Sequence, residues 1–381
     1  MKDSRIAHIT TLHSAFDTRI LYKECKSLAK YFKEVYLIAP SEENFEIDKV
    51  KVVSIPRFKN RFLRMTLGDF IAFRKALSLK SHIYHFHDPE FIPWAVLLEK
   101  FTRAKVIYDV HEDYFTSIKE KNWIKGNIFK NLLAKLFNYL EKHVAKMFDA
   151  VVLAEDYYQD SFKGTNKRLI EILNYPLTYE KPEPLKLSKN TFSIVYSGTV
   201  SENRGIWNIL KVALKLNEKT SDFKIYIIGK FNPETLEDKV KDFILKNNLK
   251  DKVEIVGGKE YVKRELIDSF YQYMDLGLVL IPYSTHYEKK LPTKFFEYML
   301  AGIPFLGTNF PRWTKFVEEN RCGLTVNPND FDEIANKIQY LMKHPDEREL
   351  MGQNGRKSVL AKYTWDKEEE KLKKLYEELI R

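Results

Sequence analysis

The chain has 381 residues, of which 44% are hydrophobic and 30% charged, and a net charge of +10. This length favours two domains, and this composition excludes an intrinsically disordered chain. The positive charge favours an anionic partner, namely nucleic acid, a membrane surface or a phosphorylated substrate. Cys25 and Cys322 form no metal motif and are typical of a reducing compartment. No run reaches the ~20 apolar residues of a spanning helix, and no signal peptide is recognised, so we expect a cytoplasmic protein.

The first half of the chain alternates short β-branched runs with helical patterns. Strands are predicted at residues 5–10, 34–40, 51–56, 82–88, 104–111 and 150–155. The segments 17–32 and 122–148 have the periodicity of amphipathic helices. Strands that alternate with helices in this way are typical of a parallel sheet in a doubly wound domain.

A stretch with three prolines and little hydrophobic pattern follows and predicts a linker. Further strands are predicted at 192–198, 223–229, 252–257, 276–282, 303–308 and 322–328, and helices at 205–219, 330–344 and about 364–381. We therefore expect an α/β chain of two doubly wound, Rossmann-like domains. Their expected bounds are 1–175 for the N-terminal domain, 176–190 for the linker, 191–362 for the C-terminal domain and 363–381 for a last helix.

Several motifs of known chemistry do not occur in the sequence. It has no G-x-G-x-x-G after the first strand, no G-x-x-x-x-G-K-[ST] and no G-x-S-x-G. His82, His85 and His87 lie on one predicted strand, where we expect them to share a face. Because no cluster of cysteines or carboxylates accompanies them, we favour a structural role for these histidines and expect no metal site.

Polar groups follow two of the predicted strands in the first half. The loop TLHSAFDTR holds His13, Asp17 and Arg19, and the loop HFHDPE holds His87 and Asp88. Asp17 can cap the next helix. Arg19 opposes the dipole of that helix and is better placed to face an anion. These five residues are candidate contacts for a polar ligand, because ligands of such sheets bind beyond the carboxyl ends of the strands.

Two further loops hold candidate site residues. YDVHEDY places His111 at the end of a buried strand, where it suits a polar substrate contact, while an aspartate such as Asp113 is better explained as a cap. In SGTVSENRGIW, a strand ends at Gly198 and a helix opens at Gly205 beside Arg204. A helix N-terminus next to an arginine is an anion site with phosphate as its natural ligand, and the alternative is an ordinary surface arginine.

The segment LPTKFFEYMLAGIP predicts a short, mostly buried helix. Pro292 stands at its start and Gly302 at its end, yet the helix carries Lys294 and Glu297 among aromatic and aliphatic residues. A buried carboxylate costs free energy of folding unless it is paired. Glu297 is therefore a candidate functional residue.

These segments resemble the retaining glycosyltransferases of family 4, which have the GT-B fold. LPTKFFEYMLAGIPFLGT resembles the family's donor-site signature, and YSGTVSENRGIWNILKV resembles its phosphate loop. HITTLHSAFDTRILYKECKSLAK and HIYHFHDPE…AKVIYDVHEDY resemble the N-terminal half of a subgroup that builds bacterial surface polysaccharides. The resemblance covers nearly the whole chain.

The resemblance implies metal-independent transfer of a sugar, with retained anomeric configuration, from a nucleoside-diphosphate donor with UDP or GDP. The acceptor would be a hydroxyl of a glycan or of a lipid-linked glycan in cell-surface polysaccharide synthesis. No cofactor is implied beyond this co-substrate. The domains would face each other across a cleft, the N-terminal one binding the acceptor and the C-terminal one the donor, and the last helix would return to the N-terminal domain.

The resemblance also implies roles for individual residues. Glu297 would accept hydrogen bonds from the ribose hydroxyls, and Arg204 would bind the diphosphate. His111 would touch the transferred sugar near the reacting centre. The remaining donor contacts would come from Gly198, Thr199, Thr293 and Lys294.

Two positions depart from the family's pattern. The first glutamate of its E-x7-E motif is Lys289 here, and Glu288 misses that position by one residue. Either Glu288 takes the role or the donor sugar is contacted otherwise, so the catalytic candidates are His111, Arg204 and Glu288. The family's arginine after the strand glycine is Thr199, and Lys294 or Arg19 are the candidates to replace that cation.

Two segments are both basic and apolar. RFKNRFLRM at 57–65 interleaves four cations with aromatic and aliphatic residues, and we expect it to be exposed. For 122–148 we favour ordinary core packing with a solvated lysine face. The apolar residues expected in that core are Ile124, Ile128, Leu132, Leu136, Leu140 and Val144. Basic amphipathic segments bind anionic membranes, so peripheral attachment at the inner face of the cell membrane is a hypothesis.

Other functions are open on the same scaffold. A nucleotide-sugar epimerase would rearrange the sugar without an acceptor, and the incomplete E-x7-E motif also allows a non-catalytic protein that binds nucleotide sugars. A nucleic-acid binder ranks last, because the sequence has no recognised nucleic-acid module.

Overall fold

A computed structural model describes residues 4–111, 127–178, 185 and 191–381 of the chain, without the side chains of 127–129 and 133. The chain divides into two compact units. Unit 1 consists of Met1–Leu177 and Trp365–Arg381, and unit 2 consists of Thr178–Thr364. Most of the predicted linker 176–190 lies outside the described residues.

Unit 1 is built on a sheet with the strand order β3-β4-β2-β1-β5-β6-β7-β8, in which only β3 and β4 pair antiparallel. Six of its strands lie in the predicted runs, while the two short edge strands β3 and β8 were not predicted. The strands are β1 Arg5–Ile9, β2 Glu34–Pro40, β3 Phe45–Ile47, β4 Val50–Ile55, β5 Ile83–Phe86, β6 Lys105–Val110, β7 Ala150–Leu153 and β8 Leu169–Glu171.

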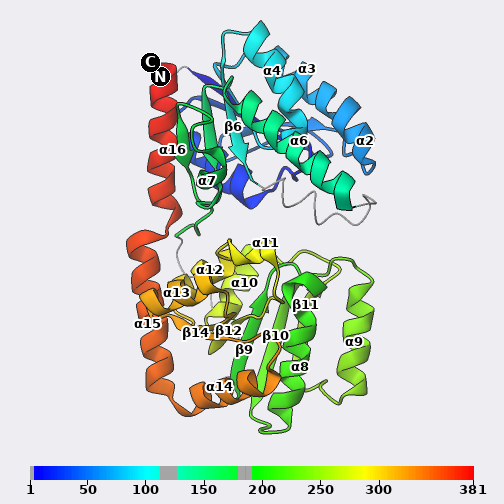
Figure 1. The fold of residues 1–381 in the computed structure, drawn as a ribbon, viewed down its shortest axis with the longest axis vertical. Coiled ribbons are helices and arrows are strands. Elements are labelled where there is room, and N and C mark those ends of the chain that lie inside the picture. The colour runs from blue at the N-terminus through cyan, green and yellow to red at the C-terminus, as the bar shows by residue number, and fades with distance from the viewer. Residues whose placement is uncertain (1–3, 112–126, 179–184, 186–190) are drawn as a thin grey trace. The chain divides into compact units, whose positions relative to one another are not determined.

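Helices cover both faces of this sheet. This is expected, because its strands have no alternation of polar and apolar residues and are therefore apolar on both faces. On one face, η1 (Thr18–Cys25), α1 (Lys26–Leu28) and α16 (Trp365–Ile380) share a hydrophobic core with the sheet. The other core is shared by the sheet with a second group of helices, of which Figure 1 shows α3, α4 and α6 on the side away from α16. The remaining described helical segments of unit 1 are α2 Arg61–Leu63, η2 Arg64–Gly68, α3 Asp69–Leu79, η3 Pro89–Phe91, α4 Ile92–Phe101, α6 Asn127–Ala145 and α7 Tyr158–Phe162.

Unit 2 contains a wholly parallel sheet with the strand order β11-β10-β9-β12-β13-β14. Its strands are β9 Phe192–Ser197, β10 Phe223–Lys230, β11 Val253–Gly258, β12 Leu276–Val279, β13 Phe305–Thr308 and β14 Gly323–Val326. Its helices are η4 Glu202–Arg204, α8 Ile206–Asn217, α9 Leu236–Lys246, α10 Arg264–Tyr271, α11 Thr285–Glu288, α12 Thr293–Ala301, α13 Pro311–Asn320, α14 Phe331–Lys343 and α15 Pro345–Lys362. All six predicted strands of this half are present.

The expected core packing of the helix at 122–148 is wrong for its three leucines, although Val144 packs against the core as expected. Leu132, Leu136 and Leu140 of α6 are exposed, whereas Ala134, Glu141 and Ala145 are buried. Glu141 accepts a hydrogen bond of 2.5 Å from the hydroxyl of Tyr108 on β6, which turns this face of the helix toward the sheet. Residues 122–126, including Ile124, lie outside the described part of the chain.

The three histidines on the fourth predicted strand do not share a face. His82 is exposed and its imidazole accepts a hydrogen bond of 2.9 Å from the backbone N–H of Arg5. His85 and His87 are buried. The spacing of three between His82 and His85 points them to opposite faces, whereas the spacing of two between His85 and His87 does not.

Candidate active site

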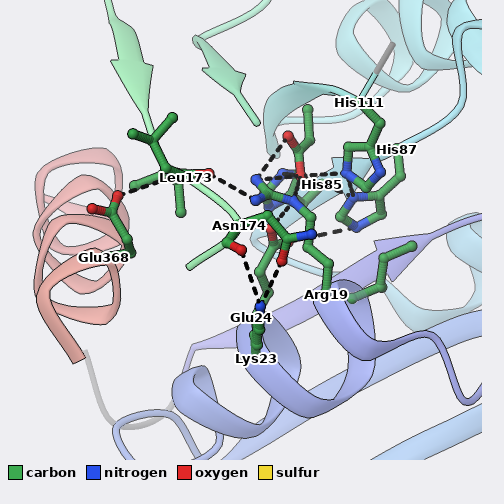
Figure 2. A network of polar contacts seen from close by, with 12 residues as sticks. Arg19, Lys23, Glu24, His85, His87, His111, Leu173, Asn174 and Glu368 are labelled. Carbon is green, nitrogen blue, oxygen red and sulfur yellow. Dashed lines mark hydrogen bonds and ion pairs between the residues drawn. The ribbon is translucent and has the colours of Figure 1, made fainter. Parts of the chain in front are cut away.

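Three predicted loop residues of unit 1 converge at the carboxyl edge of its sheet. β5 pairs with β1 on one side and with β6 on the other, so the loops that follow these strands are neighbours. The ring of His111 lies 5.4 Å from that of His13 and 5.0 Å from that of His87. Figure 2 shows His87 and His111 side by side above Arg19.

Asp109 is the centre of this polar cluster. Its carboxylate accepts hydrogen bonds from Nε2 of His111 at 2.8 Å and from Nδ1 of His87 at 3.2 Å. Arg19 donates to both of its oxygens at 3.2 Å. Although burial favours the neutral acid, the charges of Arg19 and His111 hold the pKa of Asp109 well below its usual range. Asp109 is therefore an ionised group that fixes the orientation of His111.

A chain of hydrogen bonds runs from Asp109 into the core of unit 1. His87 turns Nε2 toward Nδ1 of His8 at 3.0 Å, and Nε2 of His8 lies 3.1 Å from the hydroxyl of Tyr376 on α16. That hydroxyl lies 2.7 Å from Nδ1 of His85. Burial lowers the pKa of His8 and His85 well below the usual value and that of His87 to about 4. One proton on each imidazole satisfies every bond of the chain when His85 donates to Tyr376, Tyr376 to His8, His8 to His87 and His87 to Asp109.

The sequence suggests that Arg19 faces an external anion, but in the structure it contacts internal groups of unit 1. It is buried, its Nε lies 2.9 Å from Oε1 of Glu24, and its Nη1 donates to the carbonyl oxygen of Ile172 at 2.7 Å. Burial raises the pKa of Glu24 well above its usual value, and the charge of Asp109 adds to this effect. The two acids therefore differ in protonation, and Arg19 is the structural counter-ion of Asp109.

Asp17 and Asp88 position the loop that carries His13. Asp17 caps η1 by accepting hydrogen bonds from the backbone N–H of Arg19 at 2.8 Å and of Ile20 at 3.0 Å. Asp88 is buried and accepts from the hydroxyl of Thr10 at 2.8 Å and from nearby backbone. The side chains of His13 and His111 retain 29% and 12% of their exposure, so they are the members of the cluster that a ligand can reach.

Four residues of this cluster have the arrangement of potential metal ligands. Ligand atoms of Glu24, His85, His87 and Asp109 all lie within 4.8 Å of one another. Arg19 already contacts both carboxylates, so its positive charge occupies the place where a metal ion would balance them. The residues therefore fit a resident cation poorly.

In unit 2, two helix N-termini meet the carboxyl edge of the sheet. β9 leads through Gly198 and Arg204 into α8, and β12 leads through α11 into α12. Gly205 begins α8 with a φ of +86°, and a Cβ there would lie 2.0 Å from the carbonyl oxygen of Leu280. Gly198 has a φ of +102°, and a Cβ there would lie 3.1 Å from Nζ of Lys294. Both positions require glycine, because Gly205 lies against the backbone that follows β12 and Gly198 lies against the lysine of α12.

Lys294 and Arg204 are cations that ion pairs do not neutralise within the described part of the chain. Nζ of Lys294 lies over the ring of Tyr196, 5.0 Å from its centre. Burial lowers the pKa of Lys294 to about 7, the charge of Arg204 adds to this, and the charge of Glu297 opposes it. Two cations beside two helix N-termini form an anion site.

Glu297 of α12 is paired rather than isolated. Its Oε1 lies 2.7 Å from Nη1 of Arg264, and its Oε2 accepts a hydrogen bond of 3.2 Å from the hydroxyl of Tyr271. That hydroxyl lies 2.5 Å from Oγ of Ser197, at the end of β9. The side chain of Glu297 keeps 21% of its exposure, and a carboxylate has acceptor sites beyond these two contacts, so it can still accept a hydrogen bond from a ligand.

The remaining candidate residues of unit 2, Thr199, Thr293 and Glu288, follow strands of the same sheet, but few side-chain contacts define their roles. The carbonyl oxygen of Thr199 accepts a hydrogen bond of 2.7 Å from the hydroxyl of Tyr196. Thr293 is the exposed first residue of α12, and Glu288 is the exposed last residue of α11. Asp113, which we expected to act as a cap, lies outside the described residues.

Sequence reasoning missed four residues that hold these sites in place. Glu24, Arg264 and Tyr271 belong to segments with an ordinary amphipathic pattern, and Tyr376 lies far along the chain from the histidines that it contacts. A signal existed for Arg264, because it stands four residues before Asp268 on α10 and forms an ion pair with it at 2.8 Å. The partnership of Arg264 with Glu297 depends on packing between α10 and α12.

Comparisons with known families match both halves of the chain. Residues 18–167 match the model of glycosyltransferase family 4, and residues 179–358 match that of glycosyl transferases group 1. The chain is 25% identical over 196 residues to the capsular polysaccharide biosynthesis glycosyltransferase CapM of Staphylococcus aureus, and this match covers 51% of the chain and 48% of CapM. It is also 25% identical over 187 residues to the alpha-D-kanosaminyltransferase of Streptomyces kanamyceticus, and this match covers 49% of the chain and 45% of that enzyme. The matches thus span about half the length of these curated relatives.

Solved structures agree with the two-sheet architecture. The sucrose-phosphate synthase of Thermosynechococcus elongatus superposes with a TM-score of 0.75 at 16% identity, over 99% of both chains. A glycosyltransferase of Rickettsia africae ESF-5 superposes with a TM-score of 0.70 at 16% identity, over 100% of both chains. The fold expected from the sequence, GT-B with two Rossmann-like sheets, is confirmed.

Proposed function

The chain belongs to glycosyltransferase family 4, and from this premise we propose that it transfers a sugar from a nucleoside-diphosphate donor to a hydroxyl of a glycan or a lipid-linked glycan. We propose further that the reaction retains the anomeric configuration, uses no metal ion and serves cell-surface polysaccharide synthesis at the inner face of the membrane. The observation that carries the proposal is the anion site of unit 2, where Arg204 and Lys294 meet the N-termini of α8 and α12.

The residues of unit 2 suit the donor. In the reaction the bond between the sugar and the phosphate oxygen breaks, and the diphosphate gains negative charge. Arg204, Lys294 and the backbone N–H groups of Thr293 and its neighbours would stabilise that charge. Glu297, held by Arg264, would accept hydrogen bonds from the ribose hydroxyls.

The residues of unit 1 suit the transferred sugar and the acceptor. Asp109 engages Nε2 of His111, which leaves Nδ1 as the nitrogen available to a sugar hydroxyl. His13 would contact the same ligand. As the new bond to the acceptor oxygen forms, the hydroxyl proton would pass to the leaving phosphate. Glu288 remains a candidate contact to the donor sugar from α11.

Related proteins support the nature of the substrates. CapM is named for capsular polysaccharide biosynthesis. A structurally similar E. coli protein, with a TM-score of 0.69 at 14% identity, is described as bound with UDP-2-fluoro glucose. These names favour a UDP-sugar as the first donor to test and a surface glycan as the acceptor.

A calorimetric panel of UDP, GDP, CMP and dTDP sugars tests the donor site. We expect one nucleotide to bind and Glu297→Gln to weaken that binding by roughly 10- to 100-fold, because a hydrogen bond to a charged group contributes ~1.5–3 kcal/mol. Glu234→Gln, on the exposed surface of the same unit, is the matched control and should bind like the wild type. Binding unchanged by Glu297→Gln would remove the assigned role of that carboxylate.

A product assay separates transfer from the other functions. With a membrane lipid extract as acceptor source, we expect release of the nucleoside diphosphate together with labelled glycolipid. An isomerised sugar nucleotide formed without extract would show an epimerase, and binding without turnover would show a non-catalytic protein.

A further inference from the structure

A short stretch of unit 1 exposes large apolar side chains that a globular surface does not need. Within nine residues, on α2, η2 and the start of α3, five such side chains face outward, and Phe62 is 72% exposed. The set is Phe62, Leu63, Met65, Leu67 and Phe70. Contiguous apolar surface of this kind marks an interaction site.

The apolar stripe of α6 adds to this surface. Leu132 is 64% exposed, and Leu136, Tyr139 and Leu140 are exposed as well. α3, α4 and α6 pack against the same core of unit 1, and Figure 1 shows them with α2 on one side of that unit. We call the exposed apolar residues of 62–70 and of α6 the basic apolar surface, because of the charges that accompany them.

Nearly all the charges in these two segments are positive. The carboxylates within 57–80 and 127–147 are Asp69 and Glu141, and both are buried. Glu90 approaches from η3, but its side chain is only 5% exposed and pairs with Arg61 at 3.1 Å and Arg64 at 2.9 Å. The cations of the two segments are Arg57, Lys59, Arg61, Arg64, Arg74, Lys75, Lys80, Lys130, Lys135, Lys142 and Lys146.

We propose that the basic apolar surface docks unit 1 on an anionic lipid membrane. Lysine and arginine attract acidic headgroups, while Phe62, Leu63 and the leucines of α6 insert at the boundary with the acyl chains. No helix within the described residues is long and apolar enough to cross a bilayer, so attachment through this surface would be peripheral.

Charge argues against the other occupants. A second copy of the chain on this surface would bring two strongly positive faces together, which costs free energy. A nucleic acid would satisfy the cations but would leave the aliphatic side chains of Met65 and Leu67 without partners. A membrane is the partner that matches both properties at once, and it would bring the chain to lipid-linked acceptors.

Flotation with lipid vesicles tests this surface on the full chain. We expect binding to vesicles with about a third phosphatidylglycerol, weak binding to pure phosphatidylcholine, and loss of binding in high salt. Phe62→Ser with Met65→Ser should weaken binding, and Arg57→Glu with Lys59→Glu should weaken it at least ~10-fold, since each basic residue at the surface contributes about 1 kcal/mol. Leu132→Ser with Leu136→Ser tests the part contributed by α6.

The control variant replaces one exposed apolar residue and one exposed basic residue outside the basic apolar surface. Leu245 and Lys246 are exposed at the end of α9 in unit 2, and Leu245→Ser with Lys246→Glu should leave vesicle binding unchanged. Absence of binding to anionic vesicles at low salt, equal binding by the 57–65 variants, or variants that change only self-association or RNA binding would overturn the proposal. Nucleotide binding measured on the same variants should be unaffected, so failure of this proposal is distinguishable from failure of the proposed transferase function.

Discussion

Lys294 has a buried ammonium, and the carboxylate that acts on it among the described residues is Glu297, which is itself paired with Arg264. The groups that face it are Arg204 from η4, Tyr196 from β9 and Glu297 from its own helix. A lysine in this setting is only partly protonated near pH 7. A bound diphosphate would supply the missing negative charge and raise the pKa of Lys294 again.

Donor binding should therefore take up a proton. A ligand that raises the pKa of Lys294 from about 7 binds more weakly as pH rises above 7, because part of the binding free energy is then spent on protonation. Calorimetry of the preferred nucleotide at pH 7.5, in buffers of different ionisation enthalpy, should show uptake of a fraction of a proton. Lys294→Arg should bind without that uptake, and equal uptake by this variant would assign the proton to another group.

Asp69 should make the stability of unit 1 depend on pH. Burial raises its pKa to about 7, although the hydroxyl of Thr11 donates to it at 2.6 Å. An acid whose folded pKa is raised binds its proton more tightly when folded, so its contribution to stability is lost as pH rises from about 4 to 7. Asp69→Asn keeps the shape and the acceptor oxygen without ionising.

Urea unfolding at several pH values checks this. The variant should gain stability relative to the wild type as pH rises through that window, by up to a few kcal/mol. A difference that stays constant between pH 4.5 and 7.5 would contradict the raised pKa. Asp222→Asn, an exposed aspartate of unit 2, serves as the comparison.

Among the elements, α16 completes the polar core of unit 1 as well as its apolar core. Tyr376 serves both His8 and His85, while Glu369 accepts hydrogen bonds from Ser27 at 2.7 Å and from Lys30 and Tyr31. Tyr376→Phe would leave two buried imidazole nitrogens without this partner and should cost ~1–3 kcal/mol of unfolding free energy. Tyr340→Phe on the exposed surface of α14 should cost much less, and similar losses for both variants would show that the hydroxyl of Tyr376 is unimportant.

The strands could be predicted because runs such as EVYLIAP are apolar and rich in residues that favour strands. A strand that is covered by helices on both faces of its sheet needs no alternation of polar and apolar residues, so the apolar run alone identifies it. The buried face of α6 could not be predicted, because a four-residue repeat of leucines identifies one apolar side of a helix but not whether that side packs against the core or is exposed. Tyr108 and Glu141 decided the orientation across 33 positions of sequence. For the site, Glu297 and Arg204 lie in segments that resemble known motifs, whereas Arg264 and Glu24 gain their roles only through neighbours on other elements.

For the whole molecule, the two units make separate predictions about fragments. Residues 178–364 contain the complete sheet and the anion site of unit 2, so this fragment should fold and bind the nucleotide that the full chain prefers. Residues 1–177 lack α16 and would expose the apolar face that Trp365, Leu372 and Leu375 cover. We expect that fragment to bind a hydrophobic dye and to unfold at a lower temperature than the same residues joined to 365–381 by a short linker.

The return of the chain to unit 1 also sets an order for its synthesis. The ribosome makes the residues of unit 1 first, yet the core of that unit stays open until Tyr376 has emerged, after all of unit 2. Domains that fold during synthesis usually do so from the N-terminus onward, and here the second unit can be finished before the first. A premature stop codon near residue 360 would therefore yield a protein whose later half is sound and whose earlier half is a target for chaperones and proteases.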